Sequence, residues 1–273
     1  APALMATALA TLREAGETDR DAAWLASVVT THADLAETVA DAELIVEAIT
    51  EDAEAKRALY AALDPHAPRD AILASNTSYL DPFPLIPEGR QHRAAIAHWY
   101  TPPYLVDLVD VVGGPRCDAA VPIKLRDLYA GMGKHPIVLR TFVPGYIANR
   151  IQAVMAMELY ALLDAGVADA AEIDAAIVHG LSLRLPLLGH FMKADFTGLP
   201  LVQKALAARM VPPPPITRSA ALDRLVAEGA SGVMAGRGFY DYGGAEPAAL
   251  FEERDRRLIA LKRALKAIGS MIR

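Results

Sequence analysis

Residues 72–80 read ILASNTSYL and residues 93–112 read RAAIAHWYTPPYLVDLVDVV, and this stretch decides the fold. Two apolar runs, 94–97 and 105–112, flank a rigid Trp-Tyr-Thr-Pro-Pro turn, and His98 stands where the first run ends. A hydroxyl-rich loop, Ser75 to Ser78, closes the preceding run. Ligands bind at the strand ends of open α/β sheets. A histidine near a carboxylate is a common general acid/base pair, so the stretch predicts a reaction site.

Several candidate residues have a plain structural interpretation beside the functional one. Asp107 and Asp110 have opposite parity along a strand, so at most one of them faces the histidine, and spacing does not choose between them. A polar loop such as 75–78 is also what turns ordinarily use. Glu51 and Lys56, which open a helix after the apolar run 44–49, read equally as a dipole-compatible acid and a solvated lysine.

The periodicity of the chain changes near its middle. Up to residue 142, short β-branched or alanine-rich runs alternate with amphipathic helical segments, a pattern typical of a mostly parallel sheet covered on both faces. From residue 143 onward the pattern is helical, with a proline break at 212–215. We therefore predict an α/β domain over residues 1–142 and an all-α domain over residues 143–273. Asn149, an unusual helix-interior residue, suggests a polar partner near that first helix.

Composition narrows the function classes. The chain has 273 residues and a net charge of −6, which argues against a nucleic-acid partner. Its single cysteine, Cys117, excludes an internal disulfide and fits a reducing compartment. The seven histidines show no metal-ligand spacing, so we predict no metal. No apolar run is long enough to span a membrane and no signal pattern is visible, so a soluble cytoplasmic protein is expected.

Six blocks together resemble the L-3-hydroxyacyl-CoA dehydrogenase superfamily. They read ADAELIVEAITEDAEAKRALYAAL, ILASNTS, AHWYTPPYLVDLVDVV, GKHPIVL, VPGYIANRI and GRGFYDY, and they occur in the order typical of that family. The resemblance implies a Rossmann-type domain that binds NAD and a helical carboxy-terminal domain that builds a homodimer. It further implies reversible oxidation of a 3-hydroxy group on a small-molecule substrate, either an acyl-CoA or a free 3-hydroxy acid.

The same resemblance implies roles for individual residues. His98 would be the general acid/base, Asp110 would orient its imidazole, and Ser78 would touch both the nicotinamide and the substrate oxygen. Asn149 would hydrogen-bond near the reacting carbonyl. The positions expected to line the cofactor are Glu51, Lys56, Ser78 and Thr101. Hydride transfer to a nicotinamide with a histidine managing the proton needs no metal.

The chain departs from the family pattern in three ways. It contains no Gly-x-Gly-x-x-Gly, so the Rossmann domain is expected to be incomplete at its amino-terminal side and the chain to be a fragment of a longer protein. Asp110 replaces a glutamate. Thr101 and Met234 replace an asparagine and a lysine that contact the cofactor in many relatives.

Two alternatives stay open at this point. HWYTPPY resembles the branch of the superfamily that acts on free acids, with carnitine dehydrogenase, lambda-crystallin and the dehydrogenases of pyridoxic-acid breakdown. A dehydrogenase of a free 3-hydroxy acid is therefore the first alternative to the acyl-CoA enzyme. A non-catalytic structural or binding protein on the same scaffold is the second, since the phosphate-binding loop is missing. The acidic residue that distinguishes NAD from NADP in the family is expected to lie outside this sequence.

Overall fold

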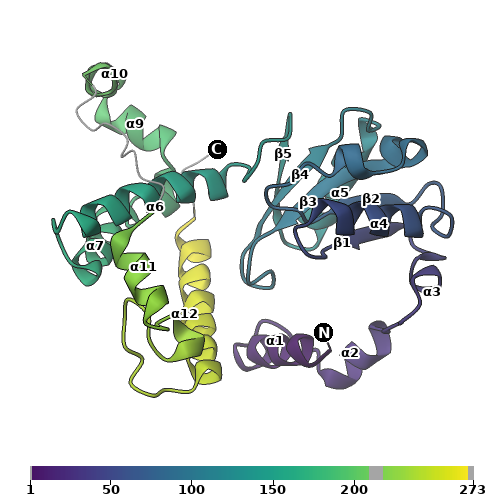
Figure 1. Cartoon of the computed structure of the whole chain (residues 1–273), viewed down its shortest axis with the longest axis horizontal. Coiled ribbons are helices and arrows are strands. Elements are labelled where there is room, and N and C mark those ends of the chain that lie inside the picture. Colours follow the sequence, from purple (N-terminus) through teal and green to yellow (C-terminus); the bar gives the residue numbers. More distant parts are fainter. Residues whose placement is uncertain (1, 209–217, 270–273) are drawn as a thin grey trace. The chain divides into compact units, whose positions relative to one another are not determined.

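The computed structural model describes residues 2–208 and 218–269, so the proline break at 212–215 lies outside the described residues. The chain divides into two compact units, Ala1–Arg150 and Ile151–Arg273, which are described separately below (Figure 1). The division falls inside helix α6 (Ala148–Asp164), so Asn149 in its first turn belongs to the first unit. The domain boundary between residues 142 and 143 stays a prediction.

A five-stranded sheet forms the centre of the first unit. Its order β1-β2-β3-β4-β5 follows the sequence, and the strands are Leu44–Glu47, Ile72–Ser75, Ala94–Trp99, Leu108–Gly113 and His135–Leu139. Three of the four strand pairings are parallel, as predicted, and the β3–β4 pairing is antiparallel. The link between β3 and β4, residues 100–107, is shorter than the roughly dozen residues that a parallel crossover needs. The two strands therefore form a hairpin-like pair.

The strand β4 begins later than its apolar pattern suggests. The run 105–112 predicts a strand from Leu105, but the amides of Leu105 and Val106 both donate to the carbonyl of Pro102 and form a turn. The ladder with β3 starts only at Val109, which pairs with Trp99. The predicted start of this strand is therefore wrong by three residues: the strand begins at Leu108. The turn uses the backbone groups that a strand would need for its ladder.

Each face of the sheet has its own apolar core. Helix α4 (Ala53–Leu63) contributes Tyr60 and Leu63 to one cluster, together with strand residues such as Ile96. Helix α5 (Ala120–Gly131) covers the other face with Val121, Leu125 and Tyr129. Since alternate residues of a strand point to opposite faces, His98 shares the α4 side with Ala94 and Ile96. Three further helices precede the sheet: α1 (Pro2–Glu14), α2 (Ala22–Val28) and α3 (Leu35–Val39).

The second unit is helical, as predicted. Besides the remainder of α6 it contains α7 (Ala170–Ala176), α8 (Leu185–Leu188), α9 (Phe191–Thr197), α10 (Leu199–Ala207), α11 (Ala220–Ala227) and α12 (Pro247–Ile268). A short π-helical segment, Ile177–Leu181, continues α7. Within residues 2–208 and 218–269, no helix combines the length and the apolar character that a membrane crossing requires.

Candidate active site

The antiparallel pairing of β3 and β4 sets His98 directly opposite Asp110. Both side chains lie on the α4 side of the sheet, and the histidine Nδ1 is 3.3 Å from the aspartate Oδ2. The pair is buried: 4% of the histidine and none of the aspartate is exposed. Asp107 lies outside β4 and uses its carbonyl to accept from the amide of His135. Of the two carboxylates that the sequence left open, Asp110 is therefore the one that faces the imidazole.

Ser78 meets the other side of the imidazole. Its hydroxyl oxygen lies 3.2 Å from His98 Nε2, so the ring stands between a carboxylate and a hydroxyl. With the Nδ1 proton directed at Asp110, Nε2 is left as the nitrogen that can accept a proton from a hydroxyl group. This is the arrangement that a general base needs, with a neutral nitrogen turned toward the reactant and a carboxylate behind the ring.

Two tyrosines enclose the imidazole. The ring of Tyr100 stands edge-on to the His98 ring at 4.7 Å between centroids, and its hydroxyl donates to Asp110 Oδ2 at 2.7 Å. Tyr146 lies at 4.6 Å and an interplanar angle of 33°, fully buried, and its hydroxyl donates to the carbonyl of Thr77. Sequence reasoning missed both. For Tyr100 a signal existed, because it follows the histidine by two residues and so shares its side of an extended chain.

Both hydroxyls stay protonated at ordinary pH. Burial raises the pKa of Tyr100, and the hydrogen bond to the Asp110 carboxylate raises it further, whereas hydrogen bonding to the backbone of Asn149 acts in the opposite direction. Burial likewise raises the pKa of Tyr146, with the negative charges of Asp110 and Glu51 adding to the effect. Each tyrosine is therefore a hydrogen-bond donor at neutral pH.

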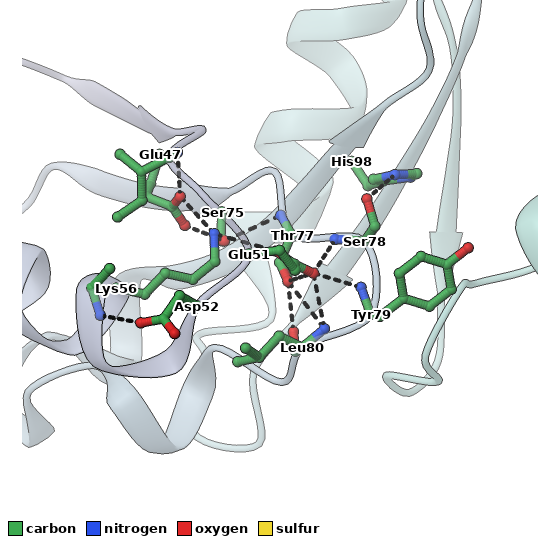
Figure 2. A network of polar contacts seen from close by, with 12 residues as sticks. Glu47, Glu51, Asp52, Lys56, Ser75, Thr77, Ser78, Tyr79, Leu80 and His98 are labelled. Carbon is green, nitrogen blue, oxygen red and sulfur yellow. Dashed lines mark hydrogen bonds and ion pairs between the residues drawn. The ribbon is translucent and has the colours of Figure 1, made fainter. Parts of the chain in front are cut away.

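Glu51 holds the loop that carries Ser78. Its Oε1 accepts hydrogen bonds from the Thr77 hydroxyl and from the amides of Ser78, Tyr79 and Leu80, at 2.8, 2.8, 2.8 and 3.1 Å (Figure 2). Burial acts to raise the pKa of Glu51, but these four donors outweigh it and lower the pKa to about 2. An ionised carboxylate thus orders the loop, because it satisfies three consecutive amides that a turn would leave open.

Glu51 belongs to a largely buried ion-pair network with Lys56 and Glu47. Lys56 Nζ lies 2.7 Å from Glu47 Oε1 and 3.5 Å from Glu51 Oε2, and only 1% of the lysine side chain is exposed. Glu47, the last residue of β1, also accepts from the Tyr60 and Ser75 hydroxyls at 2.7 and 2.6 Å. Burial tends to raise the pKa of Glu47, and the bonds from Lys56, Ser75 and Tyr60 lower it overall. Glu47 is not among the residues that the sequence pattern indicated.

The remaining predicted residues are more exposed than the His98–Asp110 pair. Thr101 is exposed beyond the end of β3 and precedes a cis bond to Pro102. Asn149 is partly exposed in the first turn of α6, close enough for its backbone to bond the Tyr100 hydroxyl. Met234 lies exposed in the second unit. Over residues 2–208 and 218–269 there is no group of three or more His, Cys, Asp or Glu side chains that could hold a metal ion.

Most of the chain matches two domains of one enzyme family. Residues 2–142 match the family model described as the NAD binding domain of 3-hydroxyacyl-CoA dehydrogenase, and residues 145–242 match its C-terminal domain. The chain belongs to the 3-hydroxyacyl-CoA dehydrogenase family. Membership confirms the predicted family, the α/β-plus-helical fold class and NAD as the cofactor of the first domain.

Relatives within the family carry names that refer to different substrates. An L-carnitine dehydrogenase of Bacillus cereus is 37% identical over 166 residues, which cover 60% of this chain and 51% of the relative. A 3-hydroxyacyl-CoA dehydrogenase of Gibberella moniliformis is 37% identical over 158 residues, or 57% and 49%. The chain thus spans about half the length of these curated relatives.

A solved structure supports the fold over nearly all of the chain. The crystal structure of a 5-formyl-3-hydroxy-2-methylpyridine 4-carboxylic acid 5-dehydrogenase, an NAD⁺-dependent dismutase, superposes with a TM-score of 0.81. The match covers 94% of this chain and 83% of that chain at 24% sequence identity, a likeness that concerns the fold alone.

The residues present fit one end of the family's cofactor. Ser78 offers its hydroxyl beside His98 at the carboxyl end of β2, and the Glu51 side chain above the buried network keeps 37% of its surface exposed. These groups suit the nicotinamide end of NAD, where a ring and its carboxamide need polar neighbours next to a proton-transfer residue. The glycine-rich turn that would hold the pyrophosphate does not occur in residues 1–273.

Proposed function

We propose that this protein is a dehydrogenase that interconverts an L-3-hydroxyacyl-CoA and the corresponding 3-ketoacyl-CoA, with NAD as the hydride carrier. The observation that supports this most is the line of Ser78, His98 and Asp110, in which the imidazole has a hydroxyl at 3.2 Å on one nitrogen and a carboxylate at 3.3 Å on the other. Such a line can remove a proton from an alcohol or return one to a ketone.

In the oxidative direction the proton and the hydride leave the substrate separately. NAD, held beside Ser78 and His98, would supply the acceptor for the hydride that leaves the carbinol carbon. His98 Nε2 takes the proton of the substrate hydroxyl, and the Ser78 hydroxyl orients the substrate oxygen toward that nitrogen. Asp110 stabilises the imidazolium that results, as a carboxylate behind a histidine does in other enzymes. The products are a ketone, a reduced cofactor and a protonated histidine, which loses its proton to solvent.

The other predicted residues receive supporting roles in this proposal. Asn149 hydrogen-bonds near the reacting carbonyl, and Thr101 lies beside the nicotinamide at the end of β3. Glu51 and Lys56 act on the cofactor site through the loop: Glu51 holds the Ser78 amide, and the buried Lys56 forms ion pairs with both Glu47 and Glu51. Ser78 serves cofactor and substrate alike.

A free 3-hydroxy acid is the second candidate substrate. The relative named L-carnitine dehydrogenase is as similar to this chain as the relative named 3-hydroxyacyl-CoA dehydrogenase, at 37% identity each. NADH consumption by the full-length protein, measured with acetoacetyl-CoA and with free acetoacetate side by side, separates the two. Turnover of the thioester alone supports the proposal, turnover of the free acid alone replaces it with the second candidate, and silence with both contradicts both.

The setting of the enzyme is also part of the proposal. We infer a homodimer built by the helical second unit, a cytoplasmic location and a role in fatty acid metabolism, in keeping with the family resemblance and with the single cysteine. Light scattering coupled to size-exclusion chromatography tests the dimer directly, because a monomeric mass at micromolar concentration would contradict it.

A further inference from the structure

Two donors compete for one oxygen of Asp110. Its Oδ2 accepts from the Tyr100 hydroxyl at 2.7 Å and faces His98 Nδ1 at 3.3 Å. The other oxygen, Oδ1, is buried and has no hydrogen-bond partner among the described residues. The carboxylate is completely buried, so water does not compete with these contacts. All of the hydrogen bonding of this carboxylate is thus concentrated on the oxygen that faces the imidazole.

The two contacts are unequal. A charge-assisted N–H···O⁻ bond is typically about 2.7–2.9 Å long, so the contact with His98 is long, whereas the contact with Tyr100 has the length of an ordinary O–H···O bond. The Tyr100 ring also packs edge-on against the imidazole at an angle of 77°. One side chain therefore touches both members of the pair and holds the aspartate more closely than the histidine does.

We propose that Tyr100 is a positioning residue of the reaction: by donating to the shared oxygen it fixes the carboxylate and weakens the hold of Asp110 on a protonated His98. The inference rests on the proposed dehydrogenase function. The titratable and polar groups that face the imidazole are Asp110, Tyr100, Tyr146 and Ser78. Among them only Tyr100 donates to the carboxylate besides the histidine itself, since the Tyr146 hydroxyl bonds the Thr77 carbonyl.

The hydrogen bond from Tyr100 is therefore expected to influence the pH at which kcat/KM reaches half of its maximum. With the tyrosine hydroxyl in place, a hydrogen bond offsets part of the carboxylate charge, so Asp110 attracts a protonated imidazole less strongly than an undivided charge would. Tyr100→Phe removes the hydroxyl and keeps the ring with its edge contact. The imidazolium then faces an undivided buried charge, and the pH midpoint of kcat/KM moves upward by about one pH unit. KM stays within about twofold, because no substrate contact is removed.

Two control comparisons make the test specific. Tyr129→Phe removes a buried tyrosine hydroxyl on the opposite face of the sheet and is expected to leave the midpoint unchanged. In an Asp110→Asn background, Tyr100→Phe is expected to shift the midpoint no further, since the charge through which it acts is gone. A merely structural role for Tyr100 would lower activity at every pH and leave the midpoint in place.

The measurement has two independent readouts. The first is the pH profile of kcat/KM for the full chain with acetoacetyl-CoA and with acetoacetate. The second is the titration midpoint of the His98 ring followed by nitrogen-15 NMR without substrate, assigned with His98→Ala. An upward shift in Tyr100→Phe alone supports the proposal, and no shift or a downward shift overturns it. If the wild-type protein turns over neither substrate, the proposed function fails, and the NMR titration still decides the role of Tyr100.

Discussion

The carboxylate of Glu51 accepts a hydrogen bond from the amide of Ser78 at 2.8 Å, although one residue follows β1 and the other follows β2. This bond ties the hydroxyl that meets His98 to the start of α4. The same carboxylate oxygen also accepts from the amides of Tyr79 and Leu80, so one side chain determines the path of the loop. The geometry of the reaction site therefore depends on a residue that does not itself face the imidazole.

Glu51→Gln is expected to destabilise the protein and to slow turnover. The neutral amide oxygen accepts more weakly from the three loop amides, and hydrogen bonds to a charged group contribute about 1.5–3 kcal/mol each. We expect a lower free energy of unfolding in urea and a kcat reduced by about tenfold, since a small misplacement of Ser78 weakens the alignment of the substrate. Equal kcat and equal urea midpoints in the two proteins would show that the loop orders itself without Glu51.

Lowering the pH tests the hydrogen bonds of Glu51 without a mutation, because protonation removes the charge of the carboxylate. The pKa of Glu51 is lowered from 4.5 to about 2 in the folded protein, so the unfolded chain takes up the proton first as the pH falls. The stabilisation by Glu51 is therefore fully present above pH 4.5 and is lost as the pH falls toward 2. Urea unfolding of wild type and Glu51→Gln between pH 6 and 2 should give two curves that converge in this window. A difference that stays constant with pH would contradict the assignment.

Lys56→Met is expected to cost about 3–5 kcal/mol of unfolding free energy, because it leaves the buried Glu47 without its cation. Thermal unfolding measures this loss. Lys124→Met is the matched control, since Lys124 is exposed on α5 and its replacement should change the melting temperature little. If both variants melt alike, Glu47 and Glu51 are not stabilised by the lysine.

His98→Ala is expected to lower kcat by at least about 100-fold while the circular dichroism spectrum still shows the folded protein. The histidine is the only group in the proposed mechanism that moves a proton. Near-normal turnover by a folded His98→Ala protein would contradict the proposed mechanism.

Asp110→Asn tests the carboxylate behind the ring. We expect a strong fall in kcat, by about 100-fold or more, and an altered pH profile, because the imidazolium loses its charged partner and the amide can present the wrong hydrogen-bonding group to Nδ1. Kinetics across pH 5–10 with NADH and the better ketone substrate measures both effects. An unaltered profile would mean that the aspartate does not govern the protonation of His98.

Residue spacing placed His98 near an acidic residue but did not choose between Asp107 and Asp110, and only the family resemblance pointed to Asp110. Strand parity separates the two aspartates, but only the register of β4 on β3 says which parity faces the α4 side. That register depends on where the turn after Pro102 ends, and the apolar pattern placed the strand start too early. The end of this turn therefore decides which of the two aspartates faces His98.

The network around Lys56 was out of reach for a different reason. Glu47, Lys56 and Ser75 come from β1, α4 and β2, and their meeting depends on how these elements pack. A lysine after a helix start reads as a solvated residue, since most lysines are. In the structure only 1% of the Lys56 side chain is exposed, so that interpretation is wrong. Nothing in the sequence around Lys56 indicates that it is buried.

The antiparallel course of β4 has a consequence for which changes in length the chain can accept. His98 and Asp110 meet because residues 100–107 return the chain in a single register. An inserted residue that shifted the pairing by one position would turn Asp110 toward the α5 face and leave the imidazole without its carboxylate. An insertion in the segment 114–119, beyond β4, would leave this pairing untouched. Among functional homologues, length variation should therefore be confined to connections outside residues 94–113.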